Sequence, residues 1–137
     1  MKLVHISDIH INADPIGGSD SVAEFAACLA HVEKRHGSAD AIVISGDLTH
    51  HGQFHSYVKL REMLAKAPLK PFLMLGNHDH RETFRQIFPE VDTDENGYVQ
   101  YVRDIAGHRL VFLDTNLVAN HSRRLGPRRQ AWLTAQL

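Results

Sequence analysis

Short apolar runs alternate with longer amphipathic segments along the first half of the chain. The apolar runs cover residues 3–6, 41–44 and 72–75. Each run is too brief for a helix and has the length of a buried strand. Residues 21–36 and about 56–66 carry apolar side chains at helical spacing between them. Strand, helix, strand, helix, strand is typical of a parallel sheet with right-handed crossovers, so the predicted fold class is α/β.

Local signals mark where these elements begin and end. Ser21-Val22-Ala23-Glu24 has the form of a capping box at the start of the first helix, and Gly37 ends that helix. Further along, residues 80–88 form a short predicted helix that stops at Pro89. Residues 98–105 and 108–114 are predicted as strands joined through Ala106-Gly107, which indicates an antiparallel hairpin. Pro127 suits the first turn of a last helix.

Composition narrows the class of protein. The chain has 137 residues with 43% hydrophobic content, enough for one domain with a real core. Its formal net charge of -1 gives no positive field, so we expect neither a nucleic-acid polymer nor a membrane as a partner. Cys28 is the only cysteine, so no intramolecular disulfide can form. With no signal-peptide pattern and no apolar stretch of membrane-spanning length, the expected location is the cytoplasm.

Polar side chains follow each of the three apolar runs. They are Asp8 and His10, then Asp47, then Asn77, His78 and Asp79. Because the carboxyl ends of parallel strands share one edge of a sheet, we expect these side chains to converge there. Gly46 and Gly76 let the backbone turn sharply and leave room beside the site.

This set of side chains predicts a metal centre. Oxygen and nitrogen donors without a thiolate favour iron, manganese or zinc. Asp47, the middle residue of the set, could bridge two ions, and Asn77 would give a neutral oxygen to the second. Two ions about 3.5–4 Å apart would hold a phosphoryl group and activate water. His78 could then protonate the leaving oxygen, with Asp79 orienting its imidazole and raising its pKa.

Three motifs together resemble those of the calcineurin-like metallophosphoesterases. They are Asp8-x-His10, Gly46-Asp47-(x)4-Gly52 and Gly76-Asn77-His78-Asp79, in this order and spacing. The runs His5-Ile6-Ser7-Asp8 and Val111-Phe112-Leu113-Asp114-Thr115 are similar to the bacterial cyclic-nucleotide phosphodiesterase and glycerophosphodiesterase branch. The resemblance covers essentially the whole chain.

The resemblance implies a fold and a role for each matching residue. Family members form an α/β/β/α sandwich, of which this chain would supply a parallel βαβαβ unit followed by an antiparallel hairpin. Asp8, His10 and Asp47 would hold the first metal ion, and Asp47 and Asn77 the second. Positions matching His10, Asp47, Asn77 and His78 also contact the phosphate in nucleotide-cleaving members.

Two departures from the family pattern qualify this interpretation. The family's later strand-end histidine and Gly-His-x-His motif are absent, and His108 and His121 lie in the wrong context to replace them. We therefore expect residues 1–137 to be the N-terminal portion of a longer phosphoesterase domain. His50 stands where purple acid phosphatases have a tyrosine, so their phenolate-bound ferric site is not expected.

Other polar residues receive more ordinary predictions. His5 is expected to be packed and hydrogen-bonded, Asp114 to bond the following loop, and Cys28 to be buried. The remaining histidines beside the site either contact substrate or are solvated: His50, His51, His55 and His80. The basic residues near the end are expected to be solvated: Arg123, Arg124, Arg128 and Arg129.

The predicted function is hydrolysis of a small phosphodiester, such as 3',5'-cyclic AMP or a glycerophosphodiester, by a dinuclear site of iron with manganese or zinc. One alternative is a phosphomonoesterase with the same site. The other is a non-catalytic interaction module on the same fold. The sequence leaves open whether the protein assembles as a homo-oligomer.

Overall fold

The computed structural model describes residues 1–12, 18–67, 70–116 and 125–137. Its elements follow the predicted order. They are β1 (Leu3–Ile6), α1 (Ser21–His36), β2 (Ala41–Ile44), α2 (Phe54–Ala65), β3 (Phe72–Leu73), α3 (Arg81–Ile87), β4 (Tyr101–Ile105), β5 (His108–Phe112) and α4 (Pro127–Gln136).

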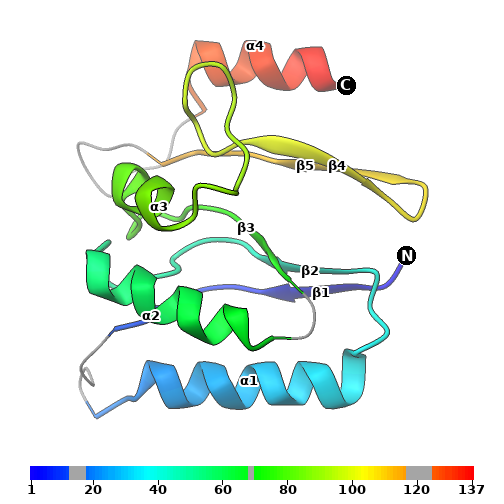
Figure 1. Cartoon of the computed structure of the whole chain (residues 1–137). Coiled ribbons are helices and arrows are strands. Elements are labelled where there is room, and N and C mark those ends of the chain that lie inside the picture. Colours follow the sequence, from blue (N-terminus) through cyan, green and yellow to red (C-terminus); the bar gives the residue numbers. More distant parts are fainter. Residues whose placement is uncertain (13–17, 68–69, 117–124) are drawn as a thin grey trace.

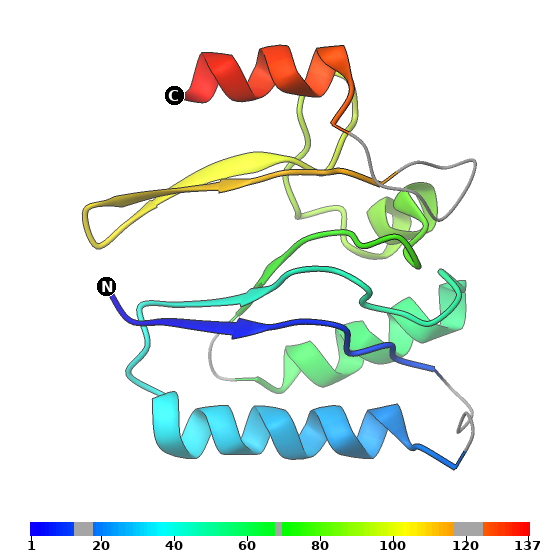
Figure 2. The ribbon, with the colours of Figure 1, turned by 180° about the vertical axis from the view of Figure 1, so that it is seen from behind.

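Four layers build the molecule, as Figures 1 and 2 show from opposite sides. The strands β1, β2 and β3 form a parallel sheet with β2 in the centre, and β4 and β5 form a separate antiparallel hairpin. Helices α1 and α2 cover one face of the parallel sheet, and the hairpin covers the other. Helix α4 lies on the outer face of the hairpin (Figure 1). The predicted α/β class and the order of parallel unit and hairpin are confirmed.

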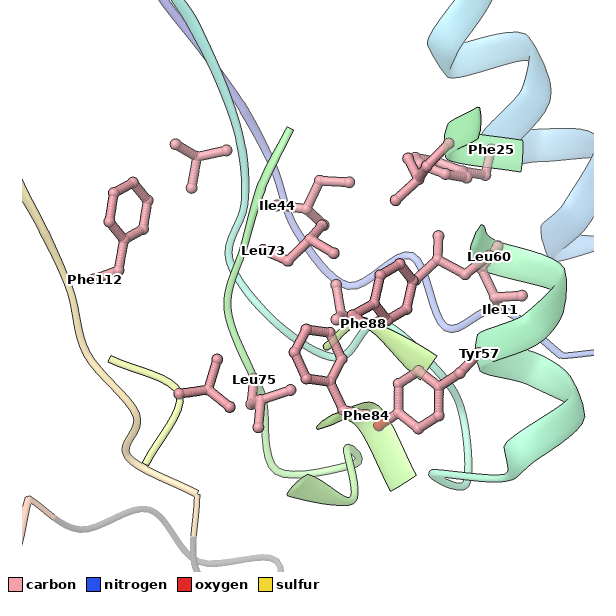
Figure 3. Packing of buried hydrophobic residues seen from close by; sticks show 14 of the residues in the cluster. Ile11, Phe25, Ile44, Tyr57, Leu60, Leu73, Leu75, Phe84, Phe88 and Phe112 are labelled. Carbon is pink, nitrogen blue, oxygen red and sulfur yellow. The ribbon is translucent and has the colours of Figure 1, made fainter. Parts of the chain in front are cut away.

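The central strand β2 is buried on both faces of the sheet, which explains its unbroken apolar sequence. The residues of β1 are exposed or half-buried. All four residues of β2 are buried. Figure 3 shows Phe25 and Leu60 from the helices on one side of the sheet and Phe112 from the hairpin on the other. The two sheets also contact directly, because the Phe72 and Phe112 rings lie 5.3 Å apart and the Tyr101 hydroxyl donates to the Leu73 carbonyl at 2.8 Å. Each large apolar side chain buried here contributes about 1.5–3 kcal/mol.

Element boundaries differ from the predictions where side chains take over backbone hydrogen bonds. The cap of α1 is Asp20 rather than Ser21, because the Asp20 carboxylate accepts from the Ala23 backbone nitrogen at 3.0 Å. The Ser21 hydroxyl instead accepts from the Asn12 backbone nitrogen. Strand β4 begins three residues later than predicted, since the Val99 backbone nitrogen donates to the Asp114 carboxylate and not to a strand partner.

Two further boundaries concern the ends of strands and helices. Strand β3 covers Phe72–Leu73 rather than 72–75, although the Met74 nitrogen still donates to the Ile44 carbonyl. Helix α2 begins at Phe54, two residues before the predicted start. The hairpin turn is confirmed at Ala106-Gly107, whose φ angles of 48° and 77° are the positive values that a tight two-residue hairpin turn requires.

Candidate active site

The chain segments after β1 and β2 run side by side and bring the first polar residues together. The Asp8 backbone nitrogen donates to the Gly46 carbonyl at 3.2 Å, and the His10 nitrogen donates to the Asp47 carbonyl at 2.9 Å. These bonds continue the parallel pairing of β1 and β2 beyond the strands themselves. Asp8, His10 and Asp47 therefore share one edge of the sheet, as the strand-end argument predicted.

All three of these residues have backbone angles that are uncommon for residues other than glycine. Their φ values are 56° for Asp8, 42° for His10 and 47° for Asp47. Aspartate and histidine tolerate this left-handed region better than most residues, but each such residue still costs about 1–3 kcal/mol. The hydrogen bonds between the two segments hold this strained backbone in place, and strain of this kind is typical of functional sites.

The resulting donor set fits a metal ion. One ligand atom from each of Asp8, His10 and Asp47 lies within 4.8 Å of the others. The Asp47 carboxylate is buried and sits 3.8 Å from His10 Nε2, while Asp8 is exposed. The His10 Nδ1 atom is buried without a hydrogen-bond partner among the described residues. The ring therefore has an uncommitted nitrogen, which fits a role as a metal ligand.

The backbones of Gly46 and Gly76 pack closely together. The absence of a side chain at Gly76 leaves the space that Asp47 occupies. A Cβ atom on Gly76 would overlap the Asp47 carboxylate and its backbone nitrogen. A Cβ on Gly46, whose φ is 108°, would overlap the Gly76 backbone. Only glycine therefore fits at either position, which supports the predicted role of both residues.

The segment after β3 brings His78 into the same place. Its backbone nitrogen donates to Asp47 Oδ1 at 3.1 Å, and its ring lies 4.9 Å from the His10 ring. The His78 Nδ1–H donates to the His50 carbonyl at 2.9 Å, which fixes the tautomer so that proton exchange with a substrate would use Nε2. Asn77 is half-buried in the same segment, between Gly76 and His78.

Asp79 has a different role from the predicted one. Its buried carboxylate accepts hydrogen bonds from the backbone nitrogens of Leu48, Thr49 and Gly76 and from the hydroxyls of Thr49 and Tyr57. It therefore joins the segments after β2 and β3, and the group that orients the His78 imidazole is the His50 carbonyl. Burial raises the pKa of Asp79, against the hydrogen bonds that favour its carboxylate.

Of the nearby histidines, His50 is the one that reaches the site. It is half-buried, with its ring 5.3 Å from that of His10 and 5.6 Å from that of His78. Desolvation and the neighbouring imidazoles lower the pKa of His50. His80 instead caps α3, and His51 and His55 are exposed. His5 is hydrogen-bonded to the Ser45 hydroxyl as predicted, but it is exposed rather than packed.

A buried polar network behind the site escaped the sequence analysis. Asp114 bonds the following loop through the Asn116 backbone nitrogen, as predicted, and also binds Arg81 through two nitrogens at 2.6 and 2.8 Å. Arg129, expected to be solvated, is 3% exposed and donates to the Asp114 and Asn116 carbonyls. An arginine at the start of a helix gives no sequence signal of burial, so only the folded chain identifies these partners.

Some residues named in the sequence analysis lie outside the described residues, and others differ in how far they are exposed. His121, Arg123 and Arg124 belong to the part of the chain that the structure does not describe. Arg128 is exposed, as expected, and Cys28 is half-buried rather than fully buried. Within the described ranges, no helix is both long and apolar enough to cross a membrane.

Comparisons with known proteins agree with this geometry. The family model of the calcineurin-like phosphoesterases matches residues 1–131. The probable cyclic nucleotide phosphodiesterase RPA0124 of Rhodopseudomonas palustris is 35% identical over 137 residues, which cover 97% of this chain and 50% of that protein. A probable cyclic nucleotide phosphodiesterase of Rhodococcus erythropolis is 28% identical over 141 residues, covering 98% of this chain and 46% of that protein.

A third relative is named for a different substrate. The glycerophosphodiester phosphodiesterase GpdQ of Enterobacter lignolyticus is 31% identical over 144 residues, covering 100% of this chain and 51% of that protein. The chain thus spans about half the length of the curated relatives it matches. These matches confirm the resemblance to the bacterial phosphodiesterase branch. Because the family model covers nearly all of its residues, this chain belongs to the calcineurin-like phosphoesterase family.

Proposed function

We propose that the protein is a dinuclear metal-dependent phosphodiesterase that hydrolyses a small phosphodiester such as 3',5'-cyclic AMP or a glycerophosphodiester. The observation that carries the proposal is the convergence of one ligand atom each from Asp8, His10 and Asp47 within 4.8 Å at the ends of adjacent parallel strands. The names of the relatives, which cover both substrate classes, support the choice of a diester.

The residues present would supply the ligands of one ion and part of the ligands of a second. Asp8, His10 and Asp47 would hold the first ion, and Asp47 with Asn77 would contribute to the second. Carboxylate, imidazole and amide donors suit iron with manganese or zinc. When bound, the ions supply the Lewis-acid chemistry that polarises the phosphoryl oxygens and activates water.

His78 is the residue we assign to the proton. Its Nδ1–H is held by the His50 carbonyl, so a second proton on Nε2 can be given to the leaving oxygen. An alkoxide released from a diester is a poor leaving group, and it needs this proton more than an activated phenolate does. The substrate phosphate would lie against His10, Asp47, Asn77 and His78.

The two alternatives predict different behaviour. A phosphomonoesterase would share the metal centre but prefer a terminal phosphate. An interaction module would keep the fold without turnover. Retention of the His78 imidazole, whose ring lies 4.9 Å from that of His10, favours the catalytic proposals over the module.

The test uses the full-length natural protein, stripped of metal and reloaded with iron, manganese or zinc. Hydrolysis of 3',5'-cyclic AMP, a glycerophosphodiester and an aryl diester is compared with that of the matching aryl monoester. Asp47→Asn should lower diester turnover by about 100-fold or more, since even changes behind a metal ligand cost 10–100-fold. Asp92→Asn, the same change at an exposed carboxylate, is the control and should leave turnover unaltered. Monoester preference would favour the first alternative, and a failure to bind metal or turn over would favour the second.

A further inference from the structure

We infer that Asn116 is a positioning residue for the segment that carries Asn77 and His78. The inference rests on the proposed function for its catalytic consequence, because that function gives Asn77 and His78 their roles. Asn116 lies 40 residues beyond Gly76 in the sequence and follows β5, the second strand of the hairpin. Asn116 is not proposed to bind metal or to contact the substrate.

The Asn116 side chain holds both ends of the segment at once. Its Nδ2 donates to the Gly76 carbonyl at 2.6 Å and to the Asp79 carbonyl at 2.7 Å. An amide nitrogen carries two hydrogens, so these two bonds use its full donor capacity. The two residues between those carbonyls are Asn77 and His78. Asn116 is 4% exposed, so water cannot readily replace its bonds.

Asn116 is itself held in place by the charged network behind the site. Its backbone nitrogen donates to Asp114 Oδ1 at 3.0 Å. Its carbonyl accepts from Arg81 at 2.8 Å and from Arg129 at 3.0 Å. Asp114 and Arg129 are buried, and hydrogen bonds to ionised groups are the stronger ones. The backbone of Asn116 is therefore fixed before its side chain meets the segment.

The opposite side of the segment is attached, in a separate way, to the segment after β2. The Asp79 carboxylate accepts from the Leu48 and Thr49 backbone nitrogens at 3.0 and 3.1 Å. Asp8, His10 and Asp47 are positioned by the backbone bonds that continue β1 and β2, which do not involve Asn116. Loss of the Asn116 amide should thus displace Asn77 and His78 most. Asp8 and His10 should stay in place, and Asp47 should lose only the bond from the His78 backbone nitrogen.

Because the two groups of site residues are held by different bonds, a positioning role of Asn116 can be distinguished from a purely structural one. Displacement of Asn77 should weaken the second ion far more than the first, and displacement of His78 should lower kcat with little change in KM. A general loss of stability would instead weaken both ions together. In the metal-free protein, the backbone amides of His78 and Asp79 should exchange faster with solvent, while those of β2 should not.

The experiment compares Asn116→Ala and the milder Asn116→Ser, whose hydroxyl can still give one hydrogen bond, in the full-length natural protein. Asn96→Ala is the matched control, because the Asn96 amide donates to Glu95 at the exposed surface. Calorimetric titration with Mn²⁺ should show the second ion about 10–100-fold weaker in Asn116→Ala and the first ion much less affected. Asn116→Ser should lie between Asn116→Ala and the wild type, and it carries the test if Asn116→Ala does not fold.

The outcomes are distinct. Equal weakening of both ions, or an unchanged second ion with unchanged amide exchange, would overturn the inference. If the wild-type protein binds fewer than two ions, the proposed function fails. The amide-exchange comparison on metal-free protein would then still decide whether Asn116 holds the segment.

Discussion

Individual residues at the site are constrained mainly by space and by backbone shape. The three left-handed residues Asp8, His10 and Asp47 are held by backbone hydrogen bonds, and Gly76 gives Asp47 its room. His78, the proposed proton donor, shows the same principle, because a backbone carbonyl, and not the neighbouring carboxylate of Asp79, fixes its tautomer. These constraints make sharp predictions for single substitutions.

His78→Ala should separate two classes of substrate in the full-length protein. Alkyl diesters, whose leaving group needs a proton, should slow by about 100-fold or more, and activated aryl diesters by about tenfold or less. Bound metal, measured by elemental analysis, should stay constant because His78 is not proposed as a ligand. Equal losses on both substrates, or a loss of metal, would assign His78 another role.

Gly76→Ala should damage the first metal site through overlap alone. The new methyl group would meet the Asp47 carboxylate and backbone, and overpacking of this kind costs about 1–3 kcal/mol of unfolding free energy. Calorimetric titration should show a large loss of first-ion affinity. Gly126→Ala is the control, since the nearest atom to its added Cβ is 3.9 Å away and its N-cap position limits the cost to about 1 kcal/mol. Intact metal binding in Gly76→Ala would contradict this account.

At the scale of elements, one buried side chain joins α2 to the segment after β3. The Tyr57 hydroxyl of α2 donates to Asp79 Oδ1 at 3.0 Å and accepts from the His80 backbone nitrogen at 2.8 Å. Tyr57 is fully buried, and its ring packs 5.9 Å from that of Phe84 in α3. The orientation of the site therefore depends on how α2 and α3 pack together.

Tyr57→Phe should lower stability by about 1–3 kcal/mol at neutral pH, because a buried acceptor and donor lose their partner. Burial, with the charge of Asp79, raises the pKa of Tyr57 above its ordinary value. The hydroxyl of the unfolded chain ionises near pH 10 while that of the folded chain does not, so the stabilisation is complete below about pH 10 and is lost as pH rises above it. The difference between variant and wild type should shrink by about 1.4 kcal/mol per pH unit above 10. Urea unfolding between pH 8 and 11 measures it, and a pH-independent difference would refute the assignment.

At the scale of the whole molecule, the second sheet does more than cover the first. Its hairpin seals the apolar face of β2 and β3, and the residues just beyond β5 reach back to the site through Asp114 and Asn116. The chain spans about half the length of the relatives it matches. Among the described residues, the donors that we assign to the two ions are Asp8, His10, Asp47 and Asn77.

We therefore predict that the 137-residue chain, produced by itself, binds metal weakly and hydrolyses little. Asp8, His10 and Asp47 remain for the first ion, but Asp47 and Asn77 alone compete poorly with the hydration of the second. Half-buried Val111, Leu113 and Trp132 would also favour self-association. Calorimetric titration, a bis-aryl phosphate assay and light scattering test this, with the full-length protein as control. Two tight sites with rapid turnover would mean that local residues such as His50 complete the centre.

The sequence by itself determined the class of fold and the convergence of Asp8, His10 and Asp47. The apolar runs at 3–6 and 41–44 became β1 and β2 without change. For β2 the reason is that a strand buried on both faces must be apolar throughout. The placement of Asp8, His10 and Asp47 followed from the rule that parallel strands end at one edge. Turn and cap residues such as Ala106-Gly107 and Pro127 also act locally, so the hairpin turn and the start of α4 were predictable.

Only the tertiary structure decided which polar side chains act as partners of one another. Asp79 is adjacent to His78 in sequence but turns to Leu48, Thr49 and Tyr57. Arg129 follows an exposed arginine but is buried. Asn116 gives no sequence signal, since its two acceptors lie about 40 residues away across the interface between the sheets. Hydrogen bonds of this kind depend on where separate elements meet after packing. A local sequence pattern does not indicate which distant residues will meet.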